Sequence, residues 1–363
     1  MRPRRRARPC RRRARHSQGD GRLPPRSLLA GWARLPALRA GLLRRLRADG
    51  LDVHGHALRG WLRRPGRGHR GDRRGDRRPL RRHRRRHRQH VRRIRRIRLL
   101  IVASTSEPLH TTELGDAGAR VVFCHGLFGQ GKNWTQIGKA LAQDHRVTLV
   151  DMPDHGRSPW SAEFDFVDAA DQVAGLLSAD DPVVLVGHSL GGKVAMIVAL
   201  RHPELVERLC VVDVSPVAYA HSEEFRNYMD AMLEVAGAPA GSRSEVDEAL
   251  RPAVPNATVR AFLMQNLHRD GDRWAWRPNL ELLRRDLAEL SDWPAEEVAG
   301  LPSYDGAVLW VAGARSHYVT DEYTPAMEAL FPRVRRVTIK DAGHWVHSEQ
   351  PEVFIEVLRR FAD

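Results

Sequence analysis

Two kinds of hydrophobic pattern alternate along the chain from residue 101 onward. Short apolar runs rich in β-branched residues are typical of buried strands, and longer segments with apolar residues every three or four positions are typical of amphipathic helices. The strand-like runs occupy residues 120–124, 146–150, 182–186, 208–212, 307–311 and 336–340. The helix-like segments between and after them include residues 165–178, 192–201 and 352–361. This alternation predicts an α/β fold with a mostly parallel sheet flanked by helices.

Strand-like runs are absent between residues 216 and 302. Helix-like patterns replace them at residues 221–235, 244–250 and 280–290. An insertion of this size between two strands predicts a helical cap over a site at the sheet edge. We therefore predict one α/β domain over residues 101–363, with the cap at residues 216–302.

The first hundred residues have a different composition. Residues 1–100 contain 36 Arg, no Lys and five Asp, which gives a net charge of +31, whereas residues 101–363 carry −15. Arg-rich runs such as residues 81–88 cannot bury enough apolar surface to fold. We predict that residues 1–100 are a low-complexity, disordered segment or an extension that is not part of the native protein.

Several functions could be assigned to this segment. It could bind nucleic acid without sequence preference, lie on a membrane surface through an amphipathic helix at residues 36–47, or serve as a transit peptide. We favour a fourth hypothesis, because an upstream or out-of-frame reading of a GC-rich gene yields Arg, Gly, Pro, Ala and His in this manner. Translation would then start near Val102, and a native mass near 41 kDa would contradict this.

The cysteines and the hydropathy pattern limit the class of protein to which the chain can belong. Cys124 and Cys210 lie in strand-like runs and are predicted to be buried free thiols, and with Cys10 they form neither a disulfide framework nor a metal-binding spacing. No apolar stretch reaches the roughly 18 residues of a membrane-spanning helix. Residues 1–30 lack the continuous apolar core of a secretory signal. We expect a cytoplasmic protein that binds no metal.

The sequence Gly187-His-Ser-Leu-Gly191 has the form G-x-S-x-G and stands between a strand-like run and a helix-like segment. This is the context of a nucleophile elbow, in which a sharp turn exposes the serine hydroxyl above the sheet. The glycines permit a close approach of backbone to backbone, where a Cβ atom would clash. Ser189 is therefore the candidate nucleophile.

A serine nucleophile needs a base, an acid that orients the base, and donors for the oxyanion. His344 follows the last predicted strand and is the candidate base, with His347 as the alternative. In many enzymes with such an elbow the acid follows the strand that corresponds to residues 307–311, but Ser316 stands there. We select Asp213, which ends the strand after that of the nucleophile.

Three other acids suit the role less well than Asp213, because none of them ends a strand at the required edge. These acids are Asp305, Asp321 and Asp341. The backbone N–H groups of Leu127 and Leu190 are the predicted oxyanion donors. The predicted substrate-pocket side chains are Phe128, Tyr219, Phe225, Trp276, Tyr318 and Trp345.

Two further features have ordinary interpretations. Residues 126–132 resemble a phosphate-binding loop, but Asn133 stands where a Ser or Thr would have to bind magnesium. Lys132 and Lys193 are interpreted as solvated surface lysines. The alternative is that they contact an acidic substrate group such as a phosphate of coenzyme A.

From about residue 109 to its end, the chain resembles the α/β-hydrolase superfamily, and within it the small esterases of the YbfF type and their mitochondrial abhydrolase relatives. The matching stretches are residues 125–129, 151–159, 187–193, 212–216 and 342–347. The resemblance implies that the acid follows the strand after that of the nucleophile, which is Asp213 here. It leaves residues 1–100 without a counterpart, and in the cap it covers only scattered positions such as Trp274 and Asn279.

These observations predict a serine hydrolase that cleaves small-molecule carboxylic esters or acyl thioesters of the acyl-CoA type. Ser189, His344 and Asp213 would form the triad, through an acyl-enzyme and without any cofactor. The same triad serves cofactor-free haloperoxidases and carbon–carbon bond lyases or hydrolases, which remain the alternatives. A non-enzymatic nucleic-acid-binding role for the Arg-rich segment would leave the triad unexplained. Epoxide hydrolase and dehalogenase chemistry needs an aspartate where Ser189 stands.

Overall fold

The computed structural model describes residues 107–363 except 221–222 and 238–240. The predictions for residues 1–100, for Cys10 and for a start near Val102 therefore lie outside the described residues. Cys124 and Cys210 are buried and free, as predicted.

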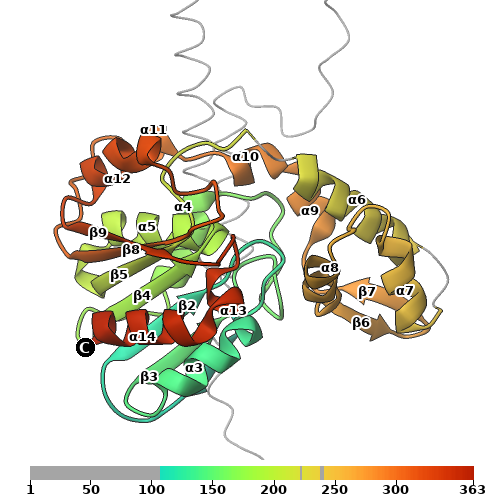
Figure 1. Ribbon diagram of the computed structural model, residues 1–363, viewed down its shortest axis with the longest axis horizontal. Coiled ribbons are helices and arrows are strands. Elements are labelled where there is room, and N and C mark those ends of the chain that lie inside the picture. The colour runs from blue at the N-terminus through green and yellow to red at the C-terminus, as the bar shows by residue number, and fades with distance from the viewer. Residues whose placement is uncertain (1–106, 221–222, 238–240) are drawn as a thin grey trace, which may run out of the picture. The chain divides into compact units, whose positions relative to one another are not determined.

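A seven-stranded sheet lies between layers of helices in the described chain (Figure 1). Its strands, in spatial order, are β1 (Thr111–Leu114), β3 (Arg146–Val150), β2 (Arg120–Cys124), β4 (Val183–His188), β5 (Val206–Val212), β8 (Ala307–Gly313) and β9 (Val334–Ile339). β1 pairs with β3 in antiparallel register, and all other pairs are parallel. The predicted mostly parallel α/β fold is confirmed, and β1, a four-residue edge strand, is an element that the sequence pattern did not predict.

Helices cover both faces of the sheet. The helices outside the insertion are α3 (Thr135–Leu141), α4 (Phe166–Ala174), α5 (Leu190–Arg201), α12 (Thr324–Leu330), α13 (Val346–Glu349) and α14 (Pro351–Ala362), with short 3-10 turns at Gly131–Trp134, Pro203–Leu205 and Asp321–Tyr323. The six predicted strands and the three predicted helices of this part are present, with ends shifted by at most four residues.

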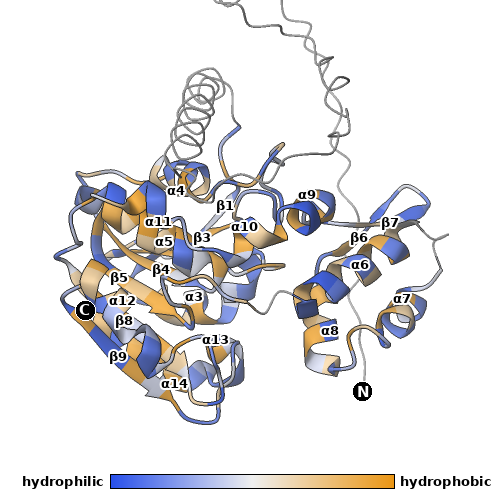
Figure 2. Ribbon diagram, turned by 90° about the horizontal axis from the view of Figure 1, so that it is seen from above, coloured by the Kyte–Doolittle hydropathy of each residue, from blue (hydrophilic) through white to orange (hydrophobic). Residues whose placement is uncertain are grey.

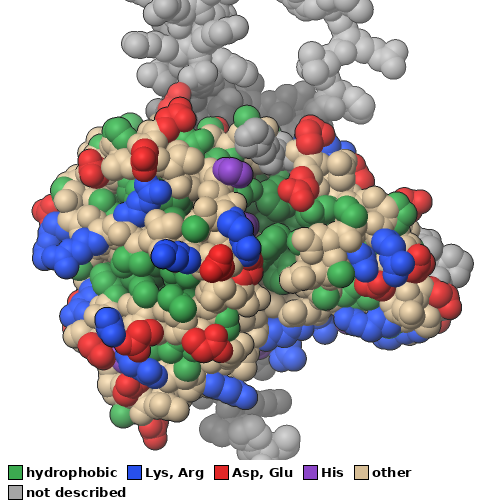
Figure 3. Space-filling model, in the orientation of Figure 1, with side chains coloured by type: hydrophobic (Ala, Val, Ile, Leu, Met, Phe, Trp, Pro, Cys, Tyr) green, Lys and Arg blue, Asp and Glu red, His purple; other side chains and the backbone are tan. Residues whose placement is uncertain are grey.

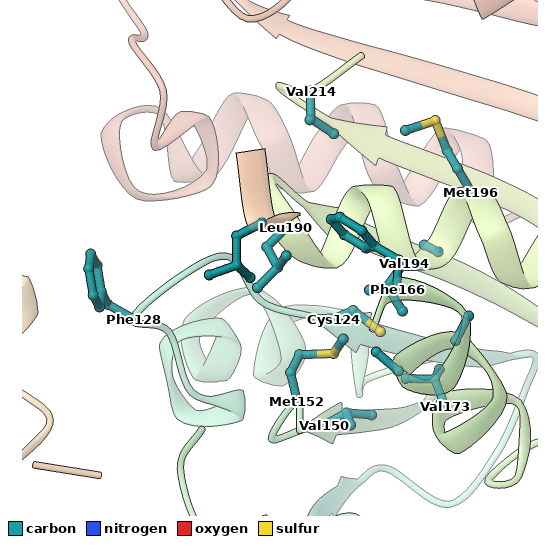
Figure 4. Close-up of a cluster of buried hydrophobic side chains, with 14 of the residues drawn as sticks. Cys124, Phe128, Val150, Met152, Phe166, Val173, Leu190, Val194, Met196 and Val214 are labelled. Atoms are coloured by element: carbon teal, nitrogen blue, oxygen red, sulfur yellow. The ribbon is translucent and has the colours of Figure 1, made fainter. Parts of the chain in front are cut away.

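Alternate residues of each strand face opposite layers, which explains the continuous apolar runs. Val122 and Cys124 pack in one hydrophobic cluster with α4 and α5, whereas Val121 and Phe123 pack in a second cluster with α3 and α14. Figure 2 shows the hydrophobic colour concentrated on the strands, and Figure 4 shows Cys124 near side chains of α4 and α5 in the first cluster. The parallel strands are therefore buried on both faces.

The insertion between β5 and β8 contains helices and one hairpin. Its elements are α6 (Glu223–Gly237), α7 (Arg243–Leu250), α8 (Ala257–Met264), β6 (Leu267–Asp270), β7 (Arg273–Trp276), α9 (Leu280–Arg285), α10 (Leu287–Ser291) and α11 (Ala295–Val298). The expectation that this segment contains no strands is wrong, because β6 and β7 pair as an antiparallel hairpin. Their two short strands mix charged and apolar residues, so neither one contains the continuous apolar run that marks a buried strand.

The glycine at position 191 allows α5 to begin directly against β2. A Cβ atom on Gly191 would lie 2.5 Å from both the Cys124 and the His125 carbonyl oxygens. We expect Gly191→Ala to lower the free energy of unfolding by about 1–3 kcal/mol, as overpacking typically does. Urea denaturation measures this change. Gly175→Ala is the control, because its φ of −61° suits any residue, and an equal loss in both variants would contradict the steric account.

Candidate active site

The turn between β4 and α5 holds Ser189 in a strained backbone conformation. Its φ of 52° and ψ of −119° lie in a region that residues other than glycine rarely adopt. A Cβ atom on Gly187 would lie 2.3 Å from the Gly191 carbonyl oxygen, so the turn requires a glycine there. The Ser189 N–H donates to the Val212 carbonyl at 3.0 Å, which fixes the turn to the end of β5. This is the geometry expected for a nucleophile elbow.

Two backbone N–H groups beside Ser189 have no protein acceptor within the part of the chain that the structure describes. One belongs to Leu190, the first residue of α5, and the other to Leu127 in the loop after β2. A Cβ atom on Gly126 would lie 3.0 Å from the Ser189 Cβ, which shows that this loop lies against the elbow. The two groups are the ones that the sequence indicated as oxyanion donors.

The structure brings Asp213 and His344 into direct contact. The His344 Nδ1 and the Asp213 Oδ2 are 2.8 Å apart, and the Asp213 side chain is completely buried. A carboxylate accepts hydrogen bonds, so Nδ1–H donates and Nε2 is left as a proton acceptor. The two residues lie at the carboxyl edge of the sheet, after β5 and β9, as the strand order required.

The Asp213 carboxylate is held by two further donors. The Gly313 N–H donates to Oδ1 at 2.9 Å, and the Ser316 hydroxyl donates to Oδ2 at 2.5 Å. Ser316 therefore stands beside Asp213, at the turn after β8 where an aspartate was expected. The sequence indicated only that Ser316 is not an acid, and its contact with Asp213 is a feature that sequence reasoning missed.

The competing acids lie elsewhere. Asp321 pairs with Arg336 at 2.7 Å, and its side chain is almost fully exposed. Asp305 lies on the loop before β8, and Asp341 follows β9 with a φ of 57°. Within residues 107–363 as described, none of these three carboxylates contacts His344.

His188, the residue before the elbow serine, supports the loop that carries His344. Its Nε2–H donates to the His344 carbonyl at 2.8 Å, and the two ring centroids are 4.7 Å apart. Burial holds the pKa of His188 well below its usual value, and the neighbouring His344 and His347 rings lower it further. A neutral His188 is therefore a donor that fixes the backbone of His344, a contact that only the fold reveals.

His347, the alternative base, packs in the core. Its ring stacks on Trp134 with the centroids 4.0 Å apart, and burial together with His344 lowers its pKa to about 3. It remains neutral at physiological pH and lies on α13, behind the loop. The geometry favours His344 as the base.

Two pockets open at Ser189. The larger, a solvent-open space of about 490 Å³, is lined by Leu127, Ser189, Leu190, Lys193, Val214, Tyr219, Phe225, Leu287, Leu290, Ser291 and Tyr318. The smaller, about 330 Å³, is lined by Leu127, Phe128, His188, Ser189, Phe225, Tyr228, Val259, Phe262, Leu263, His344 and Trp345. Side chains of the core domain and of the insertion thus line both pockets.

Five of the six side chains predicted for the pocket line one or both of these spaces. Trp276 lines neither of them. Its indole is buried and donates to the Met232 carbonyl at 2.7 Å, because β7 turns this side chain toward α6. Trp276 therefore packs inside the insertion, and its assignment to the pocket is corrected.

Lys193 is also corrected, because it is not a surface lysine. Only 2% of the residue is exposed, and its Nζ donates to the Ser291 carbonyl at 3.1 Å and to the Asp292 carbonyl at 2.6 Å. Lys132, in contrast, is exposed as predicted and donates to the Gln265 carbonyl at 3.0 Å.

In the described part of the chain, no group of three or more His, Cys, Asp or Glu side chains is arranged to hold a metal ion. None of the helices described is long and apolar enough to cross a membrane. On the face seen in Figure 3, Lys and Arg side chains are interspersed with Asp and Glu.

The fold, the elbow and the Asp–His pair define an α/β hydrolase. Residues 119–351 match the protein family that is described as "alpha/beta hydrolase fold", and the chain belongs to this family.

Among curated proteins, the chain is 37% identical over 249 residues to the mouse "sn-1-specific diacylglycerol lipase ABHD11", covering 66% of this chain and 80% of the mouse protein. It is 29% identical over 267 residues to "Esterase YbfF" of Escherichia coli, covering 73% of this chain and 99% of that protein. The solved structure of a "Marine microorganism esterase" superposes with a TM-score of 0.67 at 28% identity, covering 70% of this chain and all of that one. The expected resemblance to the small esterases is confirmed.

Proposed function

We propose that this protein hydrolyses carboxylic esters through an acyl-enzyme on Ser189. The observation that carries the proposal is the 2.8 Å contact between Asp213 and His344 at a pocket that Ser189 also lines. The strained elbow presents the serine, and a positioned imidazole is the base that a serine hydroxyl needs at neutral pH. The names of the relatives, a diacylglycerol lipase and an esterase, support the same reaction class.

The reaction has two steps. The Ser189 oxygen attacks the ester carbonyl carbon while His344 Nε2 takes the hydroxyl proton, and the carbon–oxygen bond to the alcohol then breaks as His344 returns that proton to the leaving oxygen. Water attacks the acyl-enzyme in the second step, with His344 again as base, and releases the carboxylic acid and Ser189. Asp213 holds the imidazole in the tautomer that leaves Nε2 free throughout.

The oxyanion of each tetrahedral intermediate would be bound by the Leu127 and Leu190 N–H groups. Both lack a protein acceptor in the described chain, so they need no rearrangement to donate. The positive end of the α5 dipole points at the same place, because Leu190 begins that helix. This arrangement stabilises negative charge as it develops, and it requires no cofactor.

The substrate is a small molecule with an acyl chain. Most of the side chains that line the two pockets are apolar or aromatic. Such a lining favours an acyl group over a charged polymer. Nothing observed in residues 107–363 favours halide oxidation or carbon–carbon cleavage over ester hydrolysis.

A thioester of coenzyme A is a second candidate substrate, and a group of cations favours it. Burial lowers the pKa of Lys132, and the positive charges of Arg277, Arg243 and Arg157 lower it further, whereas the Asp151 carboxylate raises it. Lys132 also reaches the Gln265 carbonyl, which places the group where the loop after β2 meets the insertion. Phosphates of a leaving group would be attracted to such a group.

We expect hexanoyl-CoA to have a KM about tenfold lower than that of hexanoyl-pantetheine, with a similar kcat, since the two share the thioester bond and differ in the phosphates. Steady-state kinetics at low and high salt measures this difference, which salt should reduce. Equal KM values for the two thioesters would contradict the phosphate contact.

A further inference from the structure

The two pockets meet at Ser189 and differ in their other walls. His344 and Trp345 line only the smaller pocket, whereas Leu190 and Lys193 line only the larger one. An ester bound at the serine therefore has two separate spaces for its two ends.

The chemistry assigns one end of the ester to each pocket, given the proposed ester hydrolysis. His344 must deliver a proton to the leaving oxygen, so the alcohol lies on the side of the imidazole, in the smaller pocket. The acyl chain then occupies the larger pocket. Its wall begins at Leu190, whose N–H would bind the carbonyl oxygen of that same acyl group.

Lys193 stands in the wall of this acyl pocket, one helical turn after Ser189. Its ammonium is surrounded by the aromatic rings of Tyr219, at 4.9 Å from Nζ to the ring centroid, and Phe166, at 5.7 Å. No acidic side chain lines the pocket, and within the described residues no ion pair joins Lys193 to a carboxylate. A buried cation without a paired anion is costly, and it occurs here in a binding pocket.

The partners of the ammonium leave it incompletely satisfied. An ammonium has three N–H donors, and two of them meet the neutral carbonyl oxygens of Ser291 and Asp292. Burial lowers the pKa of Lys193 to about 7, although the Asp292 carboxylate partly opposes this. A carboxylate supplied by a ligand would complete both the charge and the hydrogen bonding.

We propose that Lys193 makes the acyl pocket selective for an acyl group that carries a second carboxylate at its far end. Lys193 follows Ser189 by four positions, an axial rise of about 6 Å along a helix, so an acyl chain of about six carbons is a suitable length to test. The proposal therefore predicts a half-ester of adipic acid as a substrate, with its ester carbonyl at Ser189 and its free carboxylate at Nζ.

Two esters of 4-methylumbelliferone test the proposal, the hemiadipate and the hexanoate, which share the leaving group and the chain length. The variants are Lys193→Gln, which keeps a donor for the Ser291 and Asp292 carbonyls, and Lys193→Met. Lys139→Met, at an exposed lysine of α3, is the matched control. The readout is the ratio of kcat/KM for hemiadipate to kcat/KM for hexanoate.

We expect the wild type to hydrolyse hemiadipate at least as well as hexanoate. The ratio should fall about 10- to 100-fold in both Lys193 variants, since a charge-assisted hydrogen bond is lost, and should not change in Lys139→Met. A ratio that is the same in wild type and variants would overturn the proposal. A parallel loss on both esters would also overturn it, because it would show that Lys193 only ties α10 to α5.

A second measurement needs no variant. Free adipate should inhibit wild-type hexanoate hydrolysis about tenfold more strongly than free hexanoate does, and equal inhibition would overturn the carboxylate site. Different results would contradict the proposed ester hydrolysis itself. These are a wild type that cleaves neither ester, or a Ser189→Ala variant that cleaves the hexanoate ester at the wild-type rate.

Discussion

Replacing Ser189 by alanine is expected to lower kcat/KM for 4-methylumbelliferyl hexanoate by about 10⁴-fold or more, because the variant has no nucleophile. The remaining activity would come from water held near the oxyanion donors. The free energy of unfolding should change little, because alanine keeps the Cβ atom and the backbone contacts of the turn and removes only the hydroxyl group. Fluorescence kinetics and urea denaturation measure the two quantities.

Ser303→Ala provides the control for this result. Ser303 is exposed on the loop between α11 and β8, far along the chain from the elbow, and its replacement should leave both activity and stability unchanged. Wild-type turnover in Ser189→Ala would contradict the acyl-enzyme mechanism.

Asp213→Asn is expected to lower kcat by about 10³- to 10⁴-fold. Asparagine would place an amide where His344 Nδ1 and the Ser316 hydroxyl now donate, so it favours the wrong tautomer of the imidazole. The side chains at positions 213 and 344 would keep their places, and the loss in kcat would come from the position of the proton on the His344 imidazole. Full activity in this variant would assign the acid role to another carboxylate.

A second substitution tests the position of Ser316. The Ser316 Oγ lies 2.5 Å from the Asp213 Oδ2 that His344 contacts, so a carboxylate at position 316 can reach the same imidazole. We expect Ser316→Asp to restore the activity of Asp213→Asn by about tenfold or more, as measured by kcat for the double variant. A double variant no more active than Asp213→Asn would contradict this placement.

The parts of the site that lie next to strand ends could be predicted from the sequence. Ser189, Asp213 and His344 each follow an apolar run, and parallel strands bring their carboxyl ends to one edge of the sheet. The G-x-S-x-G pattern also determines a local turn, so its consequences need no long-range information. The alternation of strands and helices predicted the fold for the same reason.

The parts that could not be predicted depend on contacts between distant residues. The Lys193 ammonium donates to the carbonyls of Ser291 and Asp292, which lie almost a hundred residues later in the chain. The sequence around Lys193 in α5 does not indicate that the side chain is buried. Ser316 meets Asp213 across a similar separation. Trp276 was predicted to line the pocket because it is an aromatic residue of the cap, but the pairing of β6 and β7 determines where its ring points.

The proposed mechanism depends on a covalent intermediate on Ser189. Peptide mapping by mass spectrometry after treatment with a fluorophosphonate tests it most directly, because such reagents react with activated serine hydroxyls. We predict a single adduct on the peptide that contains Ser189, absent from Ser189→Ala and strongly reduced in Asp213→Asn. An active enzyme that carries no adduct, or an adduct on a different residue, would contradict the proposed mechanism.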